Sequence, residues 1–208
     1  MIYTLLYHHA PSKEFFEEQL KHIASKYQPV HPGEEPLKGK DGVCLTFDDA
    51  YADFPKAFAL IEKYGLKATL GIPTDLVGTP KYMNWDEIKN LAQSPLLTLA
   101  SHSHTHSNLA EACDLELEII HSKQILEAIK PINTFIFPYG KTSPESIDLA
   151  QKHYTYLMRI GTAANASWKD PLIYRIPADH LALPKEPFAL LNRLRYQAKR
   201  QLNLLRHR

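Results

Sequence analysis

The chain has 208 residues, of which 44% are hydrophobic and 23% are charged. A chain of this length can bury a sizeable core, and its composition excludes disordered, collagen-like and coiled-coil proteins. The formal net charge of +1 argues against a nucleic-acid-binding protein. No run of about 18 apolar residues is present, so the sequence predicts no transmembrane helix.

Cysteine usage and the N-terminus bear on the cellular compartment. The two cysteines, Cys44 and Cys113, are too few for a disulfide framework. Residues 1–8 lack the basic segment and the small-residue cleavage site of a secretory signal peptide. We therefore expect a cytoplasmic protein. The eleven histidines are the other unusual feature of the composition.

Apolar runs alternate with segments of helical period along the chain. In chain order, strands are predicted at residues 2–8, 43–47, 68–72, 96–101, 135–137, 156–160 and 173–177. Helices are predicted between them at residues 12–27, 52–64, 86–92, 109–129 and 143–153. Ser12 and Asn108 are suited to begin two of these helices, and Gly65 and Pro131 to end two. Residues 28–40 are rich in Pro and Gly and predict a loop.

Seven strands with intervening helices predict an α/β fold with a parallel sheet. They fit an incomplete (β/α)7 barrel. An open doubly wound sheet is the alternative, although no Gly-rich phosphate loop follows any strand. In barrels of this kind the chemistry lies at the C-terminal ends of the strands.

Four predicted strand ends carry reactive side chains: His8 and His9, then Asp48 and Asp49, then residues 101–106 (SHSHTH), then residues 137–140 (FPYG). His102 and His106 stand four residues apart, so one tight turn can direct both imidazoles at one point. With a carboxylate from a neighbouring strand end they form a known catalytic metal set. Asp48 and Asp49 are consecutive, so one can bind the cation while the other acts as a general base.

Each of these residues also has an ordinary structural interpretation. Asp49 could cap the helix that follows it, and a single histidine at a strand end is usually a hydrogen-bonded core residue. The donor set suits Zn²⁺ best, but nickel, cobalt and iron also bind two His and one carboxylate.

The motifs at these strand ends resemble those of the polysaccharide deacetylase family with NodB homology. Residues 46–49 (TFDD) match its first motif, residues 102–106 its H-[ST]-x-x-H metal motif, and residues 135–140 (FIFPYG) its third motif. The resemblance extends from about residue 3 to about residue 179. It implies a (β/α)7 barrel and a metal-dependent carbohydrate N-deacetylase.

The resemblance also implies roles for individual residues. Asp48 matches the catalytic base, and the metal ligands match Asp49, His102 and His106. Tyr139 matches the residue whose backbone N–H stabilises the oxyanion. His104 matches no ligand of the family, and we expect it to be packed or solvent-facing.

The sequence departs from the family pattern in two motifs. Ala50 replaces a glycine, which is costly where φ is positive. Ile136 replaces an arginine that would tune the base, and Arg175 in the last strand is our candidate to supply that cation. Trp168 and Tyr139 could stack on a sugar ring, although Trp168 could equally anchor a loop against the barrel.

The general acid is also unusual, because no Leu-x-His motif follows Arg175. A barrel is cyclic, so the first strand lies beside the last, and a circularly permuted member could supply the acid from its N-terminus. The biofilm-exopolysaccharide N-deacetylases resemble this layout. We predict His8 as the general acid, with His180 as the alternative.

The C-terminal segment differs from the rest of the chain. We divide the chain into a barrel domain at residues 1–184 and a basic amphipathic helix at residues 185–208. Apolar residues stand at helical spacing, namely Phe188, Leu191, Leu194, Ala198, Leu202 and Leu205. Between Ala189 and Arg208 there are six basic residues and no acidic residue, the basic ones being Arg193, Arg195, Lys199, Arg200, Arg206 and Arg208. Such a helix can lie on an anionic membrane, or it can pack its apolar face on the barrel with the arginines in solvent.

Together these features predict a metal-dependent hydrolase that removes an N-acetyl group from an amino sugar. The expected substrate is a glycan or a lipid-linked glycan precursor, with no nucleic acid as partner and with peripheral contact at the inner membrane face. A deformylase on a lipid-linked amino sugar and a non-catalytic sugar-binding relative are the alternatives. The sequence does not determine the sugar or the oligomeric state.

Overall fold

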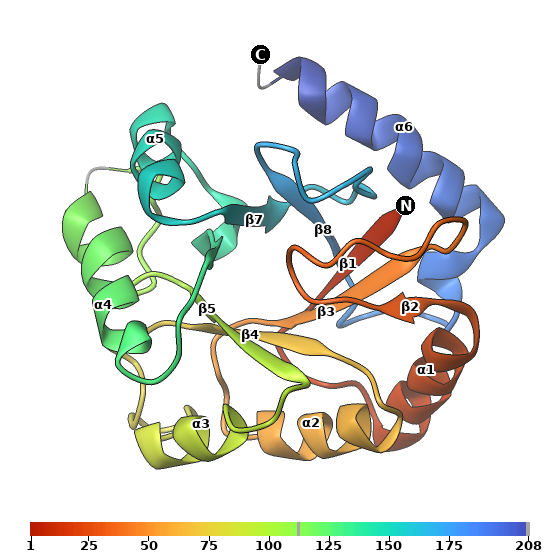
Figure 1. Ribbon diagram of the computed structural model, residues 1–208, viewed down its shortest axis with the longest axis horizontal. Helices are drawn as coiled ribbons and strands as arrows, with labels where there is room; N and C mark the ends of the chain where they lie inside the picture. The colour runs from red at the N-terminus through yellow and green to blue at the C-terminus, as the bar shows by residue number, and fades with distance from the viewer. Residues whose placement is uncertain (112, 207–208) are drawn as a thin grey trace.

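The computed structural model describes residues 1–111 and 113–206, and within them seven parallel strands close into a barrel (Figure 1). The strands are β1 (Ile2–Tyr7), β3 (Gly42–Phe47), β4 (Ala68–Ile72), β5 (Leu97–Ser101), β6 (Thr134–Ile136), β7 (Tyr156–Ile160) and β8 (Ile173–Pro177). The order β1-β8-β7-β6-β5-β4-β3 closes through the pairing of β1 with β3. This closure confirms the predicted barrel and excludes the open doubly wound sheet.

Strand β1 lies between β3 and β8, as expected for a cyclic sheet. Tyr7 is in register with Phe47, and Leu6 is in register with Pro177. The residues that follow these three strands therefore meet at one rim of the barrel. This register brings segments together that are more than 160 residues apart in the chain.

Helices surround the strands (Figure 1). They are α1 (Lys13–Lys26), α2 (Phe54–Lys63), α3 (Trp85–Leu91), α4 (Ser122–Glu127), α5 (Pro144–His153) and α6 (Leu190–Arg206). Ser12 caps α1 by accepting a hydrogen bond from Phe15 N, as predicted, and Ser143 caps α5 in the same way. The predicted loop at residues 28–40 also contains a two-residue strand, β2 (Gln28–Pro29), which pairs with β3.

The long helix predicted at residues 109–129 is wrong at its beginning. Regular structure starts only with a π-helical turn, η1 (Glu116–His121), which continues into α4. Asn108 accepts a hydrogen bond from Ala110 N and so forms a local turn instead of a helix cap. Asp114, just ahead of η1, accepts a hydrogen bond from Leu117 N. Residue 112 of the predicted helix lies outside the described residues.

The core has two parts. A large cluster fills the space between strands and helices, and a smaller one, with Cys44, Met158 and Ile173, includes the Trp168 ring. Trp168 is 4% exposed, and its Nε1 donates to the Glu34 carbonyl. It therefore anchors a loop, and its ring is not available to stack on a sugar.

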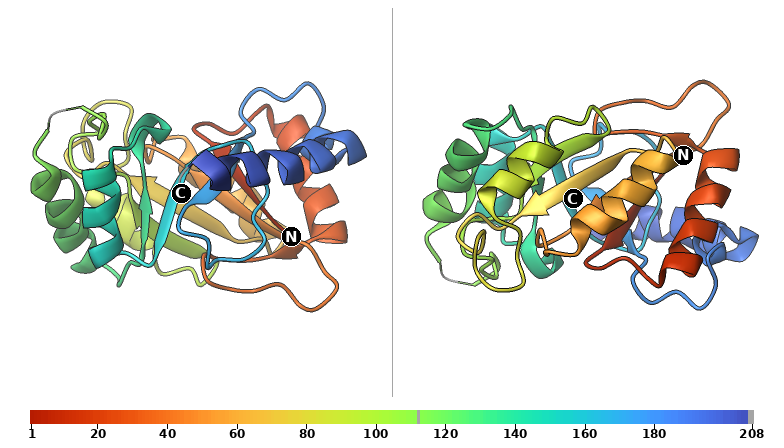
Figure 2. Two further views of the ribbon diagram at one scale, coloured as in Figure 1. Left: turned by 90° about the horizontal axis from the view of Figure 1, so that it is seen from above. Right: turned by 90° about the horizontal axis from the view of Figure 1, so that it is seen from below.

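Helix α6 runs along the outside of the barrel (Figure 2), and several of its polar side chains contact the barrel. Arg193 pairs with Asp41, Arg200 pairs with Asp170, and Asn203 donates to the Gly161 carbonyl. The alternative in which the apolar face packs on the barrel does not hold for three of its leucines. Leu191, Leu194 and Leu202 are 69%, 53% and 52% exposed. The side chains of Leu205 and Arg206, and the whole of Arg208, lie outside the described part of the chain.

Candidate active site

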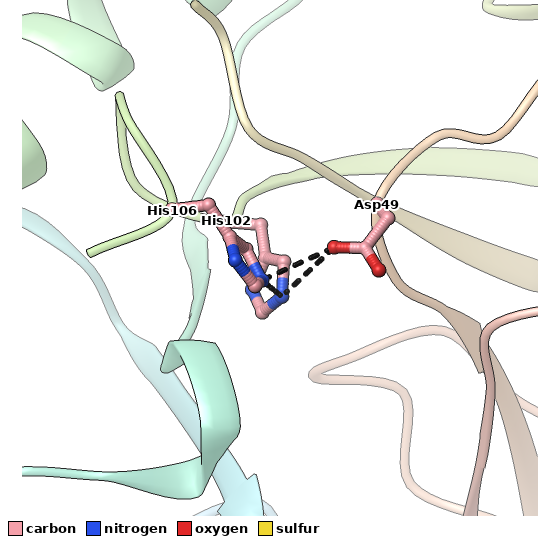
Figure 3. Close-up of side chains that lie close together, drawn as sticks. All are labelled: Asp49, His102 and His106. Carbon is pink, nitrogen blue, oxygen red and sulfur yellow. Dashed lines mark hydrogen bonds and ion pairs between the residues drawn. The ribbon is translucent and has the colours of Figure 1, made fainter. Parts of the chain in front are cut away.

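Three side chains with metal-ligating atoms meet at the C-terminal rim of the barrel. Asp49 follows β3, and His102 and His106 follow β5. Their ligand atoms all lie within 4.8 Å of one another. Figure 3 shows the three side chains pointing toward one another, from the ends of two strands that β4 separates in the sheet. Asp49 Oδ1 is 3.2 Å from His106 Nε2 and 3.7 Å from His102 Nε2.

The second nitrogen of each imidazole has its own partner. His102 Nδ1 lies 2.8 Å from the Ile136 carbonyl oxygen, to which it donates. This bond leaves the lone pair on Nε2, which faces Asp49 and His106. His106 Nδ1 lies 3.0 Å from the Tyr139 hydroxyl. The two nitrogens and one carboxylate oxygen therefore fit a divalent cation with open coordination positions.

The rim of the site is built from backbone in the left-handed region. Asp49, Ala50, Ser103, His106 and Tyr139 have φ values of 73°, 53°, 67°, 64° and 57°. Residues other than glycine adopt this region at a cost of about 1–2 kcal/mol each. Ala50 has a positive φ, so the replacement of the family's glycine by alanine carries this cost. This geometry turns Asp49 and His106 toward each other, and Asp49 caps no helix, because α2 begins after Asp53.

Asp48 lies beside the triad in a bidentate ion pair with Arg175. The two Asp48 oxygens are 2.6 and 2.9 Å from the guanidinium nitrogens, and Asp48 Oδ2 is 3.8 Å from His102 Nε2. Burial raises the pKa of Asp48, but the charges of Arg175 and His102 more than offset it and hold the pKa below its ordinary value. Arg175 therefore places a cation beside Asp48, where the sequence has no arginine at position 136.

Asp49 is ionised for a similar reason. Burial raises its pKa, while the hydrogen bond from His106 and the neighbouring histidines lower it to about 2. A charged carboxylate at this point is the form that binds a cation.

His8 is held by Asp179, a residue that the sequence interpretation missed. Asp179 accepts from the His8 backbone N–H at 2.6 Å and lies 2.8 Å from His8 Nδ1. This hydrogen bond raises the pKa of His8, and the charges of Asp48 and Asp49 raise it further. Asp179 lies two residues beyond β8, so only the pairing of β8 with β1 reveals its role. The alternative acid, His180, is exposed.

Tyr51 and Tyr82, which the sequence interpretation missed, have a pKa raised by burial and lie close enough to Asp49 for its charge to raise that pKa further. Tyr51 follows Asp49 and Ala50, and its ring lies 4.3 Å from the stacked His9 ring and 5.2 Å from the Tyr82 ring. Tyr139 is 59% exposed. His104 is directed away from the triad and pairs with the Thr74 hydroxyl at 2.8 Å, in agreement with its expected absence from the ligand set.

Comparison with protein families identifies the chain. The family model described as polysaccharide deacetylase matches residues 37–157, more than half of the sequence. The chain belongs to the polysaccharide deacetylase family. The Bacillus subtilis protein YxkH, named after the same family, is 27% identical over 179 residues. That match covers 80% of this chain and 63% of YxkH, so this chain spans less than two thirds of that relative.

Solved structures agree on the fold. The polysaccharide deacetylase BC0361 from Bacillus cereus has a TM-score of 0.78 at 22% identity, covering 90% of this chain and 67% of that one. The Streptococcus pyogenes deacetylase PplD, solved in complex with acetate, has a TM-score of 0.75 at 21% identity. That match covers 95% of this chain and 96% of PplD.

Proposed function

We propose that the protein is a metal-dependent hydrolase that removes the N-acetyl group from an amino sugar in a glycan or a lipid-linked glycan precursor. The observation that carries this proposal is the buried carboxylate of Asp48 beside the Asp49, His102 and His106 cluster. A purely sugar-binding relative does not need a base next to a cation site. Membership of the polysaccharide deacetylase family supports the same reaction class.

Asp49, His102 and His106 would hold the cation. When bound, a divalent cation supplies a Lewis acid that activates water and polarises the amide carbonyl, and we propose Zn²⁺ for this donor set. Asp48 accepts the proton of the attacking water, and Arg175 keeps this carboxylate ionised and oriented. The backbone N–H of Tyr139 donates to the oxyanion. His8 donates a proton to the departing amine.

The position of β1 supports His8 as the acid. β1 pairs with β8, so His8 lies beside the last strand, as a circularly permuted arrangement requires. Asp179 orients the ring through Nδ1, which leaves Nε2 for the substrate. The deformylase alternative uses the same groups, so the acyl group must be determined by assay.

Release of free amine from N-acetylated and N-formylated amino sugars tests the reaction. We expect turnover of an N-acetylhexosamine substrate that stops on chelation and returns with added Zn²⁺. Metal binding without turnover of any amino sugar would instead favour the sugar-binding alternative. Preference for the N-formyl substrate would favour the deformylase.

Asp179→Asn is expected to shift the pH dependence of turnover. The carboxylate raises the pKa of His8, so His8 stays protonated to higher pH in the unmodified protein. Removing the charge lowers the His8 pKa, and the alkaline limb of the kcat profile should move to lower pH. An unchanged limb would contradict His8 as the acid. Asp75→Asn, an exposed carboxylate near His104, provides the control.

We also propose that residues 185–208 bind the surface of an anionic membrane while residues 1–184 carry the reaction. None of the helices in the described ranges is long and apolar enough to cross a membrane. Helix α6 instead presents Leu191, Leu194 and Leu202 outward, with Arg195 and Lys199 exposed beside them. Leucines enter the acyl boundary and basic side chains meet the phosphates. A second copy on this face would bring the basic side chains together without an acidic partner on α6.

Vesicle sedimentation tests the membrane proposal. The protein should bind phosphatidylglycerol vesicles more than phosphatidylcholine vesicles, and less at high salt. Leu191→Glu with Leu194→Glu should abolish binding, whereas Leu37→Glu, at another exposed leucine, should not. Equal binding by all variants, or none by the unmodified protein, would contradict the proposal. A concentration-dependent dimer lost in the leucine variant would assign the face to a second copy.

A further inference from the structure

The loop that carries both histidine ligands needs external support. Ser103 and His106 have positive φ, and neither residue is glycine. Within the loop, the His106 N–H donates to the Ser103 hydroxyl at 3.0 Å. A loop with two left-handed residues holds one shape only when its surroundings determine that shape.

Glu118 provides a large part of these surroundings. Its Oε2 accepts from the backbone N–H groups of His104 and Thr105, each at 3.0 Å. Its Oε1 accepts a short hydrogen bond from the Thr105 hydroxyl. The residue is 3% exposed, so the cost of burying its charge is offset by these donors. All three bonds join residues that lie between the two ligands.

The helix that carries Glu118 is itself irregular at this point. Glu118 lies in the π-helical turn η1, a rare geometry that is frequent at functional sites. Its carbonyl accepts from the Ser122 hydroxyl at 2.7 Å, and the Ser122 hydroxyl lies 2.7 Å from that of Ser101 at the end of β5. The Glu118 backbone is therefore linked to the same strand end from which the ligand loop departs.

We propose that Glu118 is a positioning residue that sets the separation of His102 and His106 before the cation binds. The two Nε2 atoms lie 3.2 Å apart in the loop as Glu118 holds it. A loop fixed in this shape loses less conformational freedom on binding a cation. The inference rests on the proposed metal site, but it assigns to Glu118 a role in affinity and not in the reaction steps.

Titration of Zn²⁺ against a chromophoric chelator, without substrate, tests this role. Glu118→Gln keeps one carbonyl acceptor and Glu118→Ala keeps none. We expect Zn²⁺ affinity to fall about 10- to 100-fold for the glutamine variant, as for other groups that orient metal ligands, and further for the alanine variant. Glu116→Gln, an exposed residue of the same turn, should leave the affinity unchanged. Saturating Zn²⁺ should restore most of the kcat of Glu118→Gln.

The outcomes separate this inference from the proposed function. Unchanged Zn²⁺ affinity in a less stable Glu118→Gln protein would mean a purely structural role and would overturn the inference alone. Absence of Zn²⁺ binding by the unmodified protein would overturn both. Thr105→Val removes only the hydroxyl donor at an exposed residue, so it gives a milder loss of affinity if the Glu118 variants do not fold. Unchanged affinity in Thr105→Val would then count against the inference.

Discussion

Asp48→Asn should lower kcat by about 10²- to 10⁴-fold, the usual contribution of a general base. The amide is close in size to the carboxylate and accepts a hydrogen bond from Arg175, but it takes no proton from water. The three proposed ligands, Asp49, His102 and His106, are unchanged, so bound metal should persist. Single-turnover release of amine, with metal analysis of the same sample, measures both effects.

The control for Asp48→Asn is Asp86→Asn, an exposed carboxylate in the first turn of α3. It should have full activity. If Asp48→Asn retained more than a tenth of the activity with its metal in place, Asp48 would not be the base. Loss of metal together with activity would assign Asp48 to the ligand set instead.

Arg175→Met should destabilise the fold by about 3–5 kcal/mol, because it leaves the Asp48 carboxylate buried without its partner. Arg175 is 0% exposed, and its two bonds to Asp48 are 2.6 and 2.9 Å long. Loss of the guanidinium also removes the charge that holds the pKa of Asp48 down, so activity should fall as well. Chemical denaturation gives the change in the free energy of unfolding.

The double variant Asp48→Asn with Arg175→Met separates the ion pair from packing. Because no unpaired carboxylate remains, it should be more stable than Arg175→Met alone. Arg195→Met, an exposed arginine on α6, should change stability little. If the loss of stability in the double variant equalled the sum of the losses in Asp48→Asn and Arg175→Met, the ion pair would contribute nothing to the destabilisation by Arg175→Met.

Several site residues could be located from sequence because parallel strands end at one rim. The apolar runs before Asp48 and His102 predicted β3 and β5, and the barrel then brought their ends together. The same reasoning placed His8 beside the last strand. Local periodicity was sufficient here, because each prediction needed only the end of one strand and the cyclic order of the sheet.

Residues that act through distant partners could not be located in this way. Asp179 holds His8 across 171 positions, and Glu118 holds the ligand loop from a π-helical turn that no residue pattern indicated. Periodicity also showed that α6 has an apolar face without showing which way that face points. Its outward direction depends on the Asp41 and Asp170 carboxylates, which bind Arg193 and Arg200 from the barrel side.

The place of β1 between β3 and β8 has a consequence for folding. β3 is the nearer partner of β1 in the sequence, whereas all the other strands of the barrel lie between β1 and β8 in the chain. During synthesis one edge of β1 must wait unpaired until β8 emerges, and such long-range pairing is slow to form. Arg175 and Asp179 arrive with β8, so the proposed base and the proposed acid gain their partners in the last step of closure. Catalytic competence and completion of the barrel should therefore appear at the same time in a refolding experiment.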